Sequence, residues 1–383
     1  MAHRVLILGG GFGGVAAANR LRSLLPSDDE VVLVDRRSHF MMGFRKTMAV
    51  VGREPMEAGS RPLAALNAKG IRVVAADATG IEPAARAATI GGERIEADAL
   101  IVALGAETAP EAVPGLRENA LNVYSAEEVP RAAEALSSVK EGRVVVGIFG
   151  VPYKCAPAPY ELALLAQESL RARGSRATVT VFTPQPMSLP VLGKAGCVSI
   201  EDRLAGAGVD FRPDCKTERV EAGRVVLADG GEVPFDLLLA IPPHRVPRVV
   251  VEAGLAEQGG WVKVNPRTLE TPFEGVYAVG DVTAIPMANK QPMPKAGVFA
   301  EGEGEVVAER IASRLAGREP EATFAGEGFC FLEIGGGEAM FVRGNFLAEP
   351  EPQVELTTPS RESLEEKSRF ERERLDAWFG PAA

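Results

Sequence analysis

Residues 5–18 read Val-Leu-Ile-Leu-Gly-Gly-Gly-Phe-Gly-Gly-Val-Ala-Ala-Ala, and this stretch decides the fold. Four apolar residues predict a buried strand, which breaks into a glycine cluster that opens a helical pattern. Gly9, Gly11 and Gly14 satisfy the spacing G-x-G-x-x-G. The first glycine permits a tight turn, the second lets the backbone approach a pyrophosphate, and the third lets helix and strand pack closely. With the helix dipole facing the anion, the stretch predicts a dinucleotide-binding site.

A second apolar strand, residues 30–34, ends in Asp35, 21 residues after Gly14. At this spacing a carboxylate can accept hydrogen bonds from both ribose hydroxyls of a dinucleotide. Arg36 and Ala78 are predicted to contact the cofactor as well. Strand, glycines, helix and acid therefore follow in the order that a Rossmann unit requires.

The composition is that of an ordinary globular α/β chain. Its 383 residues suffice for two or three domains, and 46% of them are hydrophobic and 25% charged. The net charge of −10, without a basic run, argues against nucleic acid as a partner. Four cysteines (Cys155, Cys197, Cys215 and Cys330) are too few for a disulfide-stapled secreted scaffold. In a reducing compartment, a pair that does bond is more often catalytic than structural.

The chain begins directly with its first strand, without a signal peptide ahead of it, and no window approaches 18 apolar residues. We therefore expect a cytoplasmic protein without a transmembrane segment. Peripheral contact with a membrane surface and a homodimer stay open, and no metal site is predicted.

Two further segments predict FAD as the cofactor. Residues 98–106 form a buried strand that ends in small residues, and here Ala103 and Gly105 are predicted to contact the cofactor. Residues 271–281 form a strand that closes on Gly-Asp, where FAD enzymes place an aspartate on the ribityl chain. The long helix at 298–315 would aim its N-terminus at the isoalloxazine and stabilise negative charge there. The cofactor-binding residues predicted in this second half are Gly280, Asp281, Lys295 and Ala296.

The middle of the chain repeats the βαβ pattern but not the phosphate loop. Strands at 143–149 and 177–182 flank a helix at 159–173. Between them, residues 147–155 keep two glycines but insert Pro152, which removes a backbone donor, among bulky residues. The second strand leads into Thr183 instead of a ribose-binding acid. This domain is predicted to have lost its nicotinamide nucleotide and to offer Cys155 instead.

The predicted fold class is α/β, with two Rossmann-like domains of the glutathione-reductase type and a small C-terminal α+β region. Residues 1–108 and 258–320 form a discontinuous FAD domain, and residues 109–257 form the second domain, which carries Cys155. Residues 321–383 contain an alternating hairpin, which turns through three glycines and carries Cys330, and a final helix at 361–379.

Together these residues resemble the sulfide-oxidising flavoproteins, namely sulfide:quinone oxidoreductase and the flavin subunit of flavocytochrome c sulfide dehydrogenase. The segments that carry the resemblance are residues 155–161 (Cys-Ala-Pro-Ala-Pro-Tyr-Glu), 279–281, 294–297, 328–330 and 367–371. The resemblance implies FAD, a redox-active pair made by Cys155 and Cys330, and an acid/base role for Glu161, with Lys295 also placed among the catalytic residues. It implies sulfide or a small thiol or persulfide as the substrate, and a quinone or a redox protein as the acceptor.

The sequence departs from that family in two places. Residues 124–129 lack the third cysteine that many of the quinone reductases carry. The final helix mixes acidic and basic residues densely, unlike a basic interfacial helix. These departures leave the acceptor open between a quinone and a protein.

Three alternatives remain. One is an NAD(P)H-dependent flavoprotein of the type II NADH:quinone dehydrogenase kind, against which the rewritten loop argues. Another is a flavin-bearing thiol sensor without turnover, and a third is a persulfide or CoA-disulfide reductase, which needs a nicotinamide site. We interpret Cys197 and Cys215 as buried structural residues, His244 as part of a structural turn, and Trp378 with Phe379 as a core or dimer contact.

Overall fold

The computed structural model describes residues 2–381 of the chain. Its first sheet is parallel, with the strand order β21-β9-β1-β2-β5. The strands are β1 (Arg4–Leu8), β2 (Glu30–Asp35), β5 (Ile71–Ala75), β9 (Ala99–Val102) and β21 (Val276–Ala278). Helices pack on one face of this sheet and an antiparallel segment, residues 78–96, packs on the other, so its inner strands are apolar throughout. Strand β21 follows β9, its neighbour in the sheet, by some 170 residues, so the sheet is built from two distant parts of the chain.

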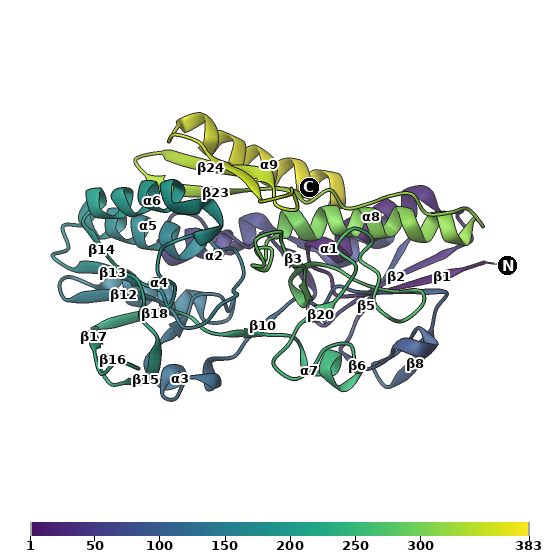
Figure 1. Ribbon diagram of the computed structural model, residues 1–383, viewed down its shortest axis with the longest axis horizontal. Helices are drawn as coiled ribbons and strands as arrows, with labels where there is room; N and C mark the ends of the chain where they lie inside the picture. Colours follow the sequence, from purple (N-terminus) through teal and green to yellow (C-terminus); the bar gives the residue numbers. More distant parts are fainter. Residues whose placement is uncertain (1, 382–383) are drawn as a thin grey trace.

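Helices α1 (Phe12–Leu24) and α8 (Gly297–Leu315) lie side by side along this sheet (Figure 1). Glycines bring them close, because a Cβ added to Gly304 would lie 2.3 Å from the carbonyl oxygen of Gly13. Both helices begin at the carboxyl ends of strands, the edge at which parallel sheets bind ligands.

A second five-stranded parallel sheet repeats the arrangement, with the order β11-β18-β12-β13-β14. Its strands are β11 (Leu121–Asn122), β12 (Arg143–Ile148), β13 (Thr178–Phe182), β14 (Val209–Arg212) and β18 (Leu237–Ile241). Its helices are α4 (Val129–Ser138), α5 (Ala158–Ala172) and α6 (Gly193–Ala207). The fold class predicted from the sequence is thereby confirmed, while the domain boundaries stay a prediction.

Short strands and small helices flank the two parallel sheets. Two three-stranded meanders are formed by β6 (Ala78–Glu82), β7 (Ala87–Ile90) and β8 (Glu93–Glu96), and by β15 (Thr217–Glu221), β16 (Arg224–Leu227) and β17 (Glu232–Pro234). The antiparallel pairs of short strands are β3 (His39–Met41) with β4 (Ser60–Pro62) and β10 (Glu107–Thr108) with β19 (His244–Arg245). Strands β20 (Val262–Lys263) and β22 (Thr283–Ala284) form a parallel pair. Small helices are α2 (Arg45–Val50), α3 (Leu116–Asn119) and α7 (Arg248–Glu252). After β4, a 3-10 helix spans Leu63–Lys69.

The C-terminal region lies across both halves of the molecule (yellow in Figure 1). It consists of β23 (Glu327–Gly335), β24 (Glu338–Asn345), β25 (Gln353–Leu356) and α9 (Arg361–Phe379). Strand β23 packs on α5 of the second half and on α8 of the first half. At the end of α9, the ring of Trp378 packs edge-on against Phe12 and Phe40, which makes it a core contact.

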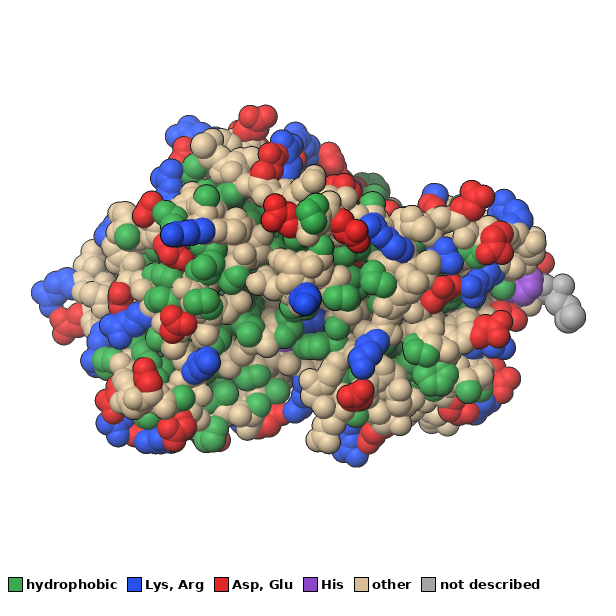
Figure 2. Space-filling model, viewed as in Figure 1, with side chains coloured by type: hydrophobic (Ala, Val, Ile, Leu, Met, Phe, Trp, Pro, Cys, Tyr) green, Lys and Arg blue, Asp and Glu red, His purple; other side chains and the backbone are tan. Residues whose placement is uncertain are grey.

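The surface carries no large area of one charge on the face that Figure 2 shows, where acidic and basic side chains are interspersed along the rim. Within residues 2–381, no helix has the length and apolar character needed to cross a membrane.

Candidate active site

One cavity of about 880 Å³ runs between the two sheets and the C-terminal region. It collects side chains from all three parts of the chain. The predicted site residues that line it are Gly11, Asp35, Arg36, Ala78, Gly105, Cys155, Glu161, Gly280, Asp281, Lys295, Ala296 and Cys330.

Three predicted cofactor residues lie behind the cavity wall and shape the turn. Gly9 has a φ of +109°, and a Cβ there would lie 2.2 Å from the carbonyl oxygen of Ala103. A Cβ on Gly14 would lie 1.8 Å from the carbonyl oxygen of Gly9. Gly9, Gly14 and Ala103 therefore let the first strand, its helix and the crossing strand approach one another, and they do not face the cavity.

The glycine loop itself fits a pyrophosphate. A Cβ added to Gly11 meets nothing within 4 Å, so the backbone at this position borders open cavity. The neighbouring N–H of Gly10 donates to the Asp35 carboxylate over 2.6 Å. Burial favours the neutral form of Asp35, but the guanidinium and N–H of Arg37 and the N–H of Gly10 together lower its pKa. Asp35 is thus held ionised where a ribose hydroxyl would donate to it.

The carboxylate of Asp281 is a second feature that indicates a cofactor in the cavity. Its Oδ1 is buried and has no hydrogen-bond partner among the described residues. Buried polar atoms are almost always paired, so this oxygen indicates a donor that belongs to a ligand. Burial raises the pKa of Asp281, against the opposing charges of Lys154, Lys295 and Lys46. An unpaired carboxylate oxygen in a cavity that starts at a dinucleotide loop fits the ribityl hydroxyls of FAD.

The side chain of Lys295 is fixed by two hydrogen bonds and by a contact with an aromatic ring. Its Nζ donates to the carbonyl oxygens of Asp281 over 2.8 Å and Thr283 over 2.9 Å, and it lies 3.4 Å from the ring centroid of Trp261. Burial lowers its pKa to about 8. Its backbone carbonyl accepts the N–H of Cys155 over 2.7 Å. Lys295 thereby links the loop that carries Cys155 to the segment of Asp281.

Cys155 lies in a turn just before α5, with a φ of +53°. Its carbonyl accepts the N–H of Ala158 over 2.9 Å and the hydroxyl of Tyr124 over 3.4 Å. Burial and the charge of Glu161 raise the pKa of the Cys155 thiol to about 12, although the ammonium groups of Lys367 and Lys46 oppose the shift. A thiolate formed here therefore depends on the positive charges around it.

Cys330 lies on β23 between two phenylalanines and faces the same cavity. Both thiols are free in the structure. Burial raises the pKa of Cys330, and the charges of Cys155 and Glu161 raise it further. Cys197 and Cys215 are also free, but they are buried in the second half of the chain and do not line the cavity.

Glu161 sits in a buried network of charges beside the cysteines. Its carboxylate accepts the N–H of Glu333 over 2.8 Å and lies 3.1 Å from Nζ of Lys367 through both oxygens. Lys367 also donates to Glu333 over 3.2 Å. Burial raises the pKa of Glu161 despite the nearby Lys367. The carboxylate of Glu161, the predicted acid/base residue, is therefore in direct contact with the ammonium group of Lys367 from the last helix.

No role was predicted from the sequence for three residues of the site, which are Lys154, Lys46 and Tyr124. Lys154 adjoins Cys155, and its Nζ donates to the carbonyl oxygen of Ala106 over 2.9 Å. Lys46 follows the irregular segment after β3 and lines the cavity, where burial and the charge of Lys154 lower its pKa to about 8. Tyr124 lines the cavity, and its hydroxyl donates to the carbonyl oxygen of Cys155. In the sequence, these residues stand out only because they lie next to segments predicted to form the site.

The second sheet offers no comparable phosphate loop among the described residues. Helix α5 follows Pro157 and has Pro159 in its first turn, so two backbone donors are missing where phosphate would bind. A Cβ on Gly150 would lie 3.1 Å from Pro243. His244 lies outside the cavity, with Nδ1 donating to the Pro242 carbonyl over 2.9 Å and its pKa lowered by burial to about 3.

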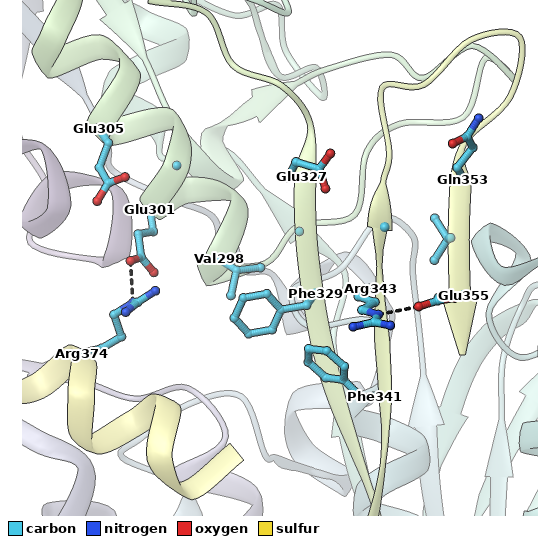
Figure 3. A pocket seen from close by; sticks show the side chains of 14 residues that line it. Val298, Glu301, Glu305, Glu327, Phe329, Phe341, Arg343, Gln353, Glu355 and Arg374 are labelled. Atoms are coloured by element: carbon cyan, nitrogen blue, oxygen red, sulfur yellow. Dashed lines mark hydrogen bonds and ion pairs between the residues drawn. The ribbon is translucent and has the colours of Figure 1, made fainter. Parts of the chain in front are cut away.

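A separate groove of about 830 Å³ lies between α8, the three-stranded sheet and α9 (Figure 3). Val298 and Phe329 line both this groove and the main cavity. Arg374 pairs with Glu301 over 2.5 Å at one side, and Arg343 pairs with Glu355 at the other. The groove therefore reaches the cavity wall next to Cys330.

Comparisons with known proteins agree with this geometry. Residues 3–304 match the family model described as pyridine nucleotide-disulphide oxidoreductase. The sulfide-quinone reductase of Aquifex aeolicus is 31% identical to this chain over 339 residues, covering 82% of the chain and 77% of that protein. The mitochondrial sulfide:quinone oxidoreductase of Mus musculus is 22% identical over 363 residues, covering 91% and 79%. The X-ray structure of the sulfide:quinone oxidoreductase from Aquifex aeolicus matches with a TM-score of 0.89 and 26% identity, covering 99% of this chain and 92% of that one.

Proposed function

Because this chain belongs to the pyridine nucleotide-disulphide oxidoreductases, and within them to the sulfide:quinone oxidoreductases, we propose that it oxidises sulfide with FAD and passes the electrons to a quinone. The observation that carries the proposal is the placement of Cys155 and Cys330. They lie 175 residues apart in the chain, yet they line one cavity together with the dinucleotide loop. In this proposal residues 1–108 and 258–320 hold FAD, and residues 109–257 and 321–383 each supply one cysteine.

The sulfur step is a thiol–disulfide exchange. In the oxidised enzyme Cys155 and Cys330 form a disulfide, and hydrosulfide attacks one of its sulfurs. A new sulfur–sulfur bond forms as the cysteine–cysteine bond breaks, which leaves a persulfide on one cysteine and a thiolate on the other. FAD, when bound, supplies the acceptor for the two electrons that the sulfur loses.

Charges around the cysteines suit that step. Lys367 and Lys46 both lower the pKa of the Cys155 thiol, so they stabilise the thiolate that the exchange releases. Glu161 and Lys367, 3.1 Å apart, hold a proton between them in a buried position, where it is available to the departing or entering sulfur. Lys295 acts as a positioning residue through its backbone contact with Cys155.

The acceptor site in this proposal is the aromatic cluster on the groove side of Cys330. The ring of Phe370 lies 5.3 Å from Phe329, and Phe331 lies 4.9 Å from Phe341. Such aromatic faces favour a flat, apolar ring, and the groove of Figure 3 leads to them from outside. A lipid-soluble quinone reaches the groove from a membrane, so peripheral membrane contact is part of the proposal.

The test is an anaerobic titration of the purified yellow protein with sulfide, following the flavin absorption band. We expect bleaching by sulfide alone, with recovery of the band when a quinone analogue is added. Cys155→Ala and Cys330→Ala should each slow bleaching by at least about a hundredfold. Cys215→Ala is the matched control, because that thiol is buried away from the cavity.

The other outcomes separate the alternatives. Bleaching by NADH but not by sulfide would overturn the proposal and favour a type II NADH dehydrogenase. Bleaching by sulfide that survives both cysteine variants would overturn the cysteine route. Bleaching by neither reductant would favour a thiol sensor without turnover.

A further inference from the structure

Helix α5 packs against strand β23, and two hydrogen bonds join the helix to this strand and to the turn that follows it. The carboxylate of Glu161 accepts the N–H of Glu333 over 2.8 Å. The carboxylate of Glu168, two turns farther along α5, accepts the N–H of Gly336 over 2.7 Å. We call these contacts the inner and the outer rung.

The outer rung holds the turn that ends β23. Strand β23 ends at Gly335, and Gly335, Gly336 and Gly337 all have a positive φ, so the backbone forms a glycine turn before β24. Glu161 and Glu168 lie seven residues apart in α5, which corresponds to about 10.5 Å along the helix. The two rungs therefore hold β23 and its turn against α5 at two separate points.

The two cysteines lie on the same two segments. Cys155 precedes Glu161 by six residues, in the turn just before α5, and Cys330 precedes Glu333 by three residues within β23. A shift of β23 along α5 therefore moves Cys330 relative to Cys155.

Arg53, in the turn that follows α2, contacts one residue of each rung. Its guanidinium pairs with both Glu333 and Glu168. Gly335, with a φ of +85°, leaves room for the carboxylate, because a Cβ there would lie 3.3 Å from it. Neither Arg53 nor Glu168 lines the cavity, and their side chains are 32% and 40% exposed.

We propose that Glu168 and Arg53 are positioning residues that set the register between α5 and β23, and with it the spacing of Cys155 and Cys330. The inference rests on the proposed function of the two cysteines as a redox pair. A disulfide tolerates only a narrow range of Cα and Cβ separations, and strain makes it easier to reduce. Loosening the outer rung therefore destabilises the disulfide although no residue of the cavity has changed.

The experiment measures the equilibrium of the pair in the holoenzyme. The protein is held anaerobically in glutathione buffers, in which one protein disulfide and two glutathione thiols exchange for two protein thiols and one glutathione disulfide. Acid quenching, thiol labelling and mass spectrometry then give the fraction of Cys155 linked to Cys330.

We expect the equilibrium constant for disulfide formation to fall about three- to tenfold in Glu168→Ala and in Arg53→Gln, where tenfold corresponds to about 30 mV for a two-electron couple. Glu168→Asp keeps the charge but shortens the side chain, so its constant should lie between those of Glu168→Ala and the wild type. The matched control is Glu309→Gln, which breaks the similarly exposed pair of Arg20 and Glu309 between α1 and α8. That control should leave the constant unchanged.

The outcomes are distinguishable. A wild-type protein that forms the disulfide, together with variants that keep its equilibrium constant, would overturn this inference and leave the proposed function standing. An equal fall in Glu309→Gln would also overturn it, because the effect would then be general. A wild type without any Cys155–Cys330 disulfide would overturn both proposals. Arg53→Gln serves as the second variant if Glu168→Ala does not fold.

Discussion

Nζ of Lys367 lies 3.1 Å from each carboxylate oxygen of Glu161, in a buried contact that ties the last helix to the helix following Cys155. Lys367→Met should cost about 3–5 kcal/mol of stability, because it leaves the buried carboxylate of Glu161 without a counter-ion, whereas Glu333 keeps its pair with Arg53. Denaturant unfolding of the holoenzyme, followed by tryptophan fluorescence, measures this loss.

The double variant Lys367→Met with Glu161→Gln is the control for that prediction. Removing the uncompensated charge of Glu161 should recover part of the lost stability, so the two changes should not be additive. Additive losses would show that the contact of Lys367 with Glu161 contributes little.

The thiol of Cys155 should react slowly at neutral pH, because its pKa is raised by burial to about 12. Alkylation of the reduced protein by iodoacetamide, followed by mass spectrometry, should accelerate from pH 7 to pH 10 as the thiolate fraction rises. Lys46 has a pKa of about 8, so its charge favours the thiolate only below that pH. Lys46→Met should therefore slow alkylation several-fold near pH 7 and hardly at all above about pH 9.

Lys263→Met removes an exposed lysine far from the cavity and provides the control for this pH profile. A constant ratio of rates between wild type and Lys46→Met at every pH would contradict the assigned influence of Lys46.

The sequence predicted the fold class correctly because the signals for its elements are local. Apolar runs mark the strands of both parallel sheets, and glycines mark the turns after them. The last helix, Arg361–Phe379, has the bounds expected from its pattern.

The site was less predictable, because most of it depends on contacts between distant elements. Asp35 and Gly11 belong to a local motif, so their place at the cavity follows from spacing. The approach of Cys155 to Cys330 was implied only by a family resemblance, since no periodicity links residues so far apart. The contacts of Lys367 with Glu161 and of Arg53 with Glu168 arise from packing across three elements, which no local pattern encodes.

Two glycines of the dinucleotide loop should respond differently to alanine. A Cβ at Gly11 meets nothing within 4 Å and points toward the cavity, so Gly11→Ala should fold but bind FAD more weakly. A Cβ at Gly14 would lie 1.8 Å from the carbonyl oxygen of Gly9, so Gly14→Ala should yield little folded protein. Circular dichroism and the flavin content of the purified variants distinguish the two results. Equal flavin content in Gly11→Ala and the wild type would contradict the placement of the pyrophosphate.

Asp35 should be needed for FAD affinity. The carboxylate accepts the N–H of Gly10 over 2.6 Å and stays ionised beside Arg37. Asp35→Asn keeps an acceptor but loses the charge, so FAD affinity should fall about ten- to a hundredfold, the range for a lost charged hydrogen bond. Flavin fluorescence on titration of the apoprotein measures it. Glu30→Gln, at the other end of the same strand, should bind FAD as the wild type does.

Phe370 should separate the quinone half of the reaction from the sulfide half. Its ring lies 5.3 Å from Phe329 and 5.3 Å from the guanidinium carbon of Arg374, on the groove side of the cavity. Phe370→Leu removes an aromatic face from the proposed acceptor site but stays apolar, so the KM for a quinone analogue should rise about tenfold. Anaerobic bleaching by sulfide should keep its rate within about twofold, because the thiol–disulfide exchange forms and breaks no bond to this ring. Phe273→Leu is the control, because Phe273 is partly buried against the apolar core of the first sheet and does not line the cavity. A slower sulfide step with an unchanged KM for the quinone would place Phe370 in the sulfur chemistry and move the acceptor site elsewhere.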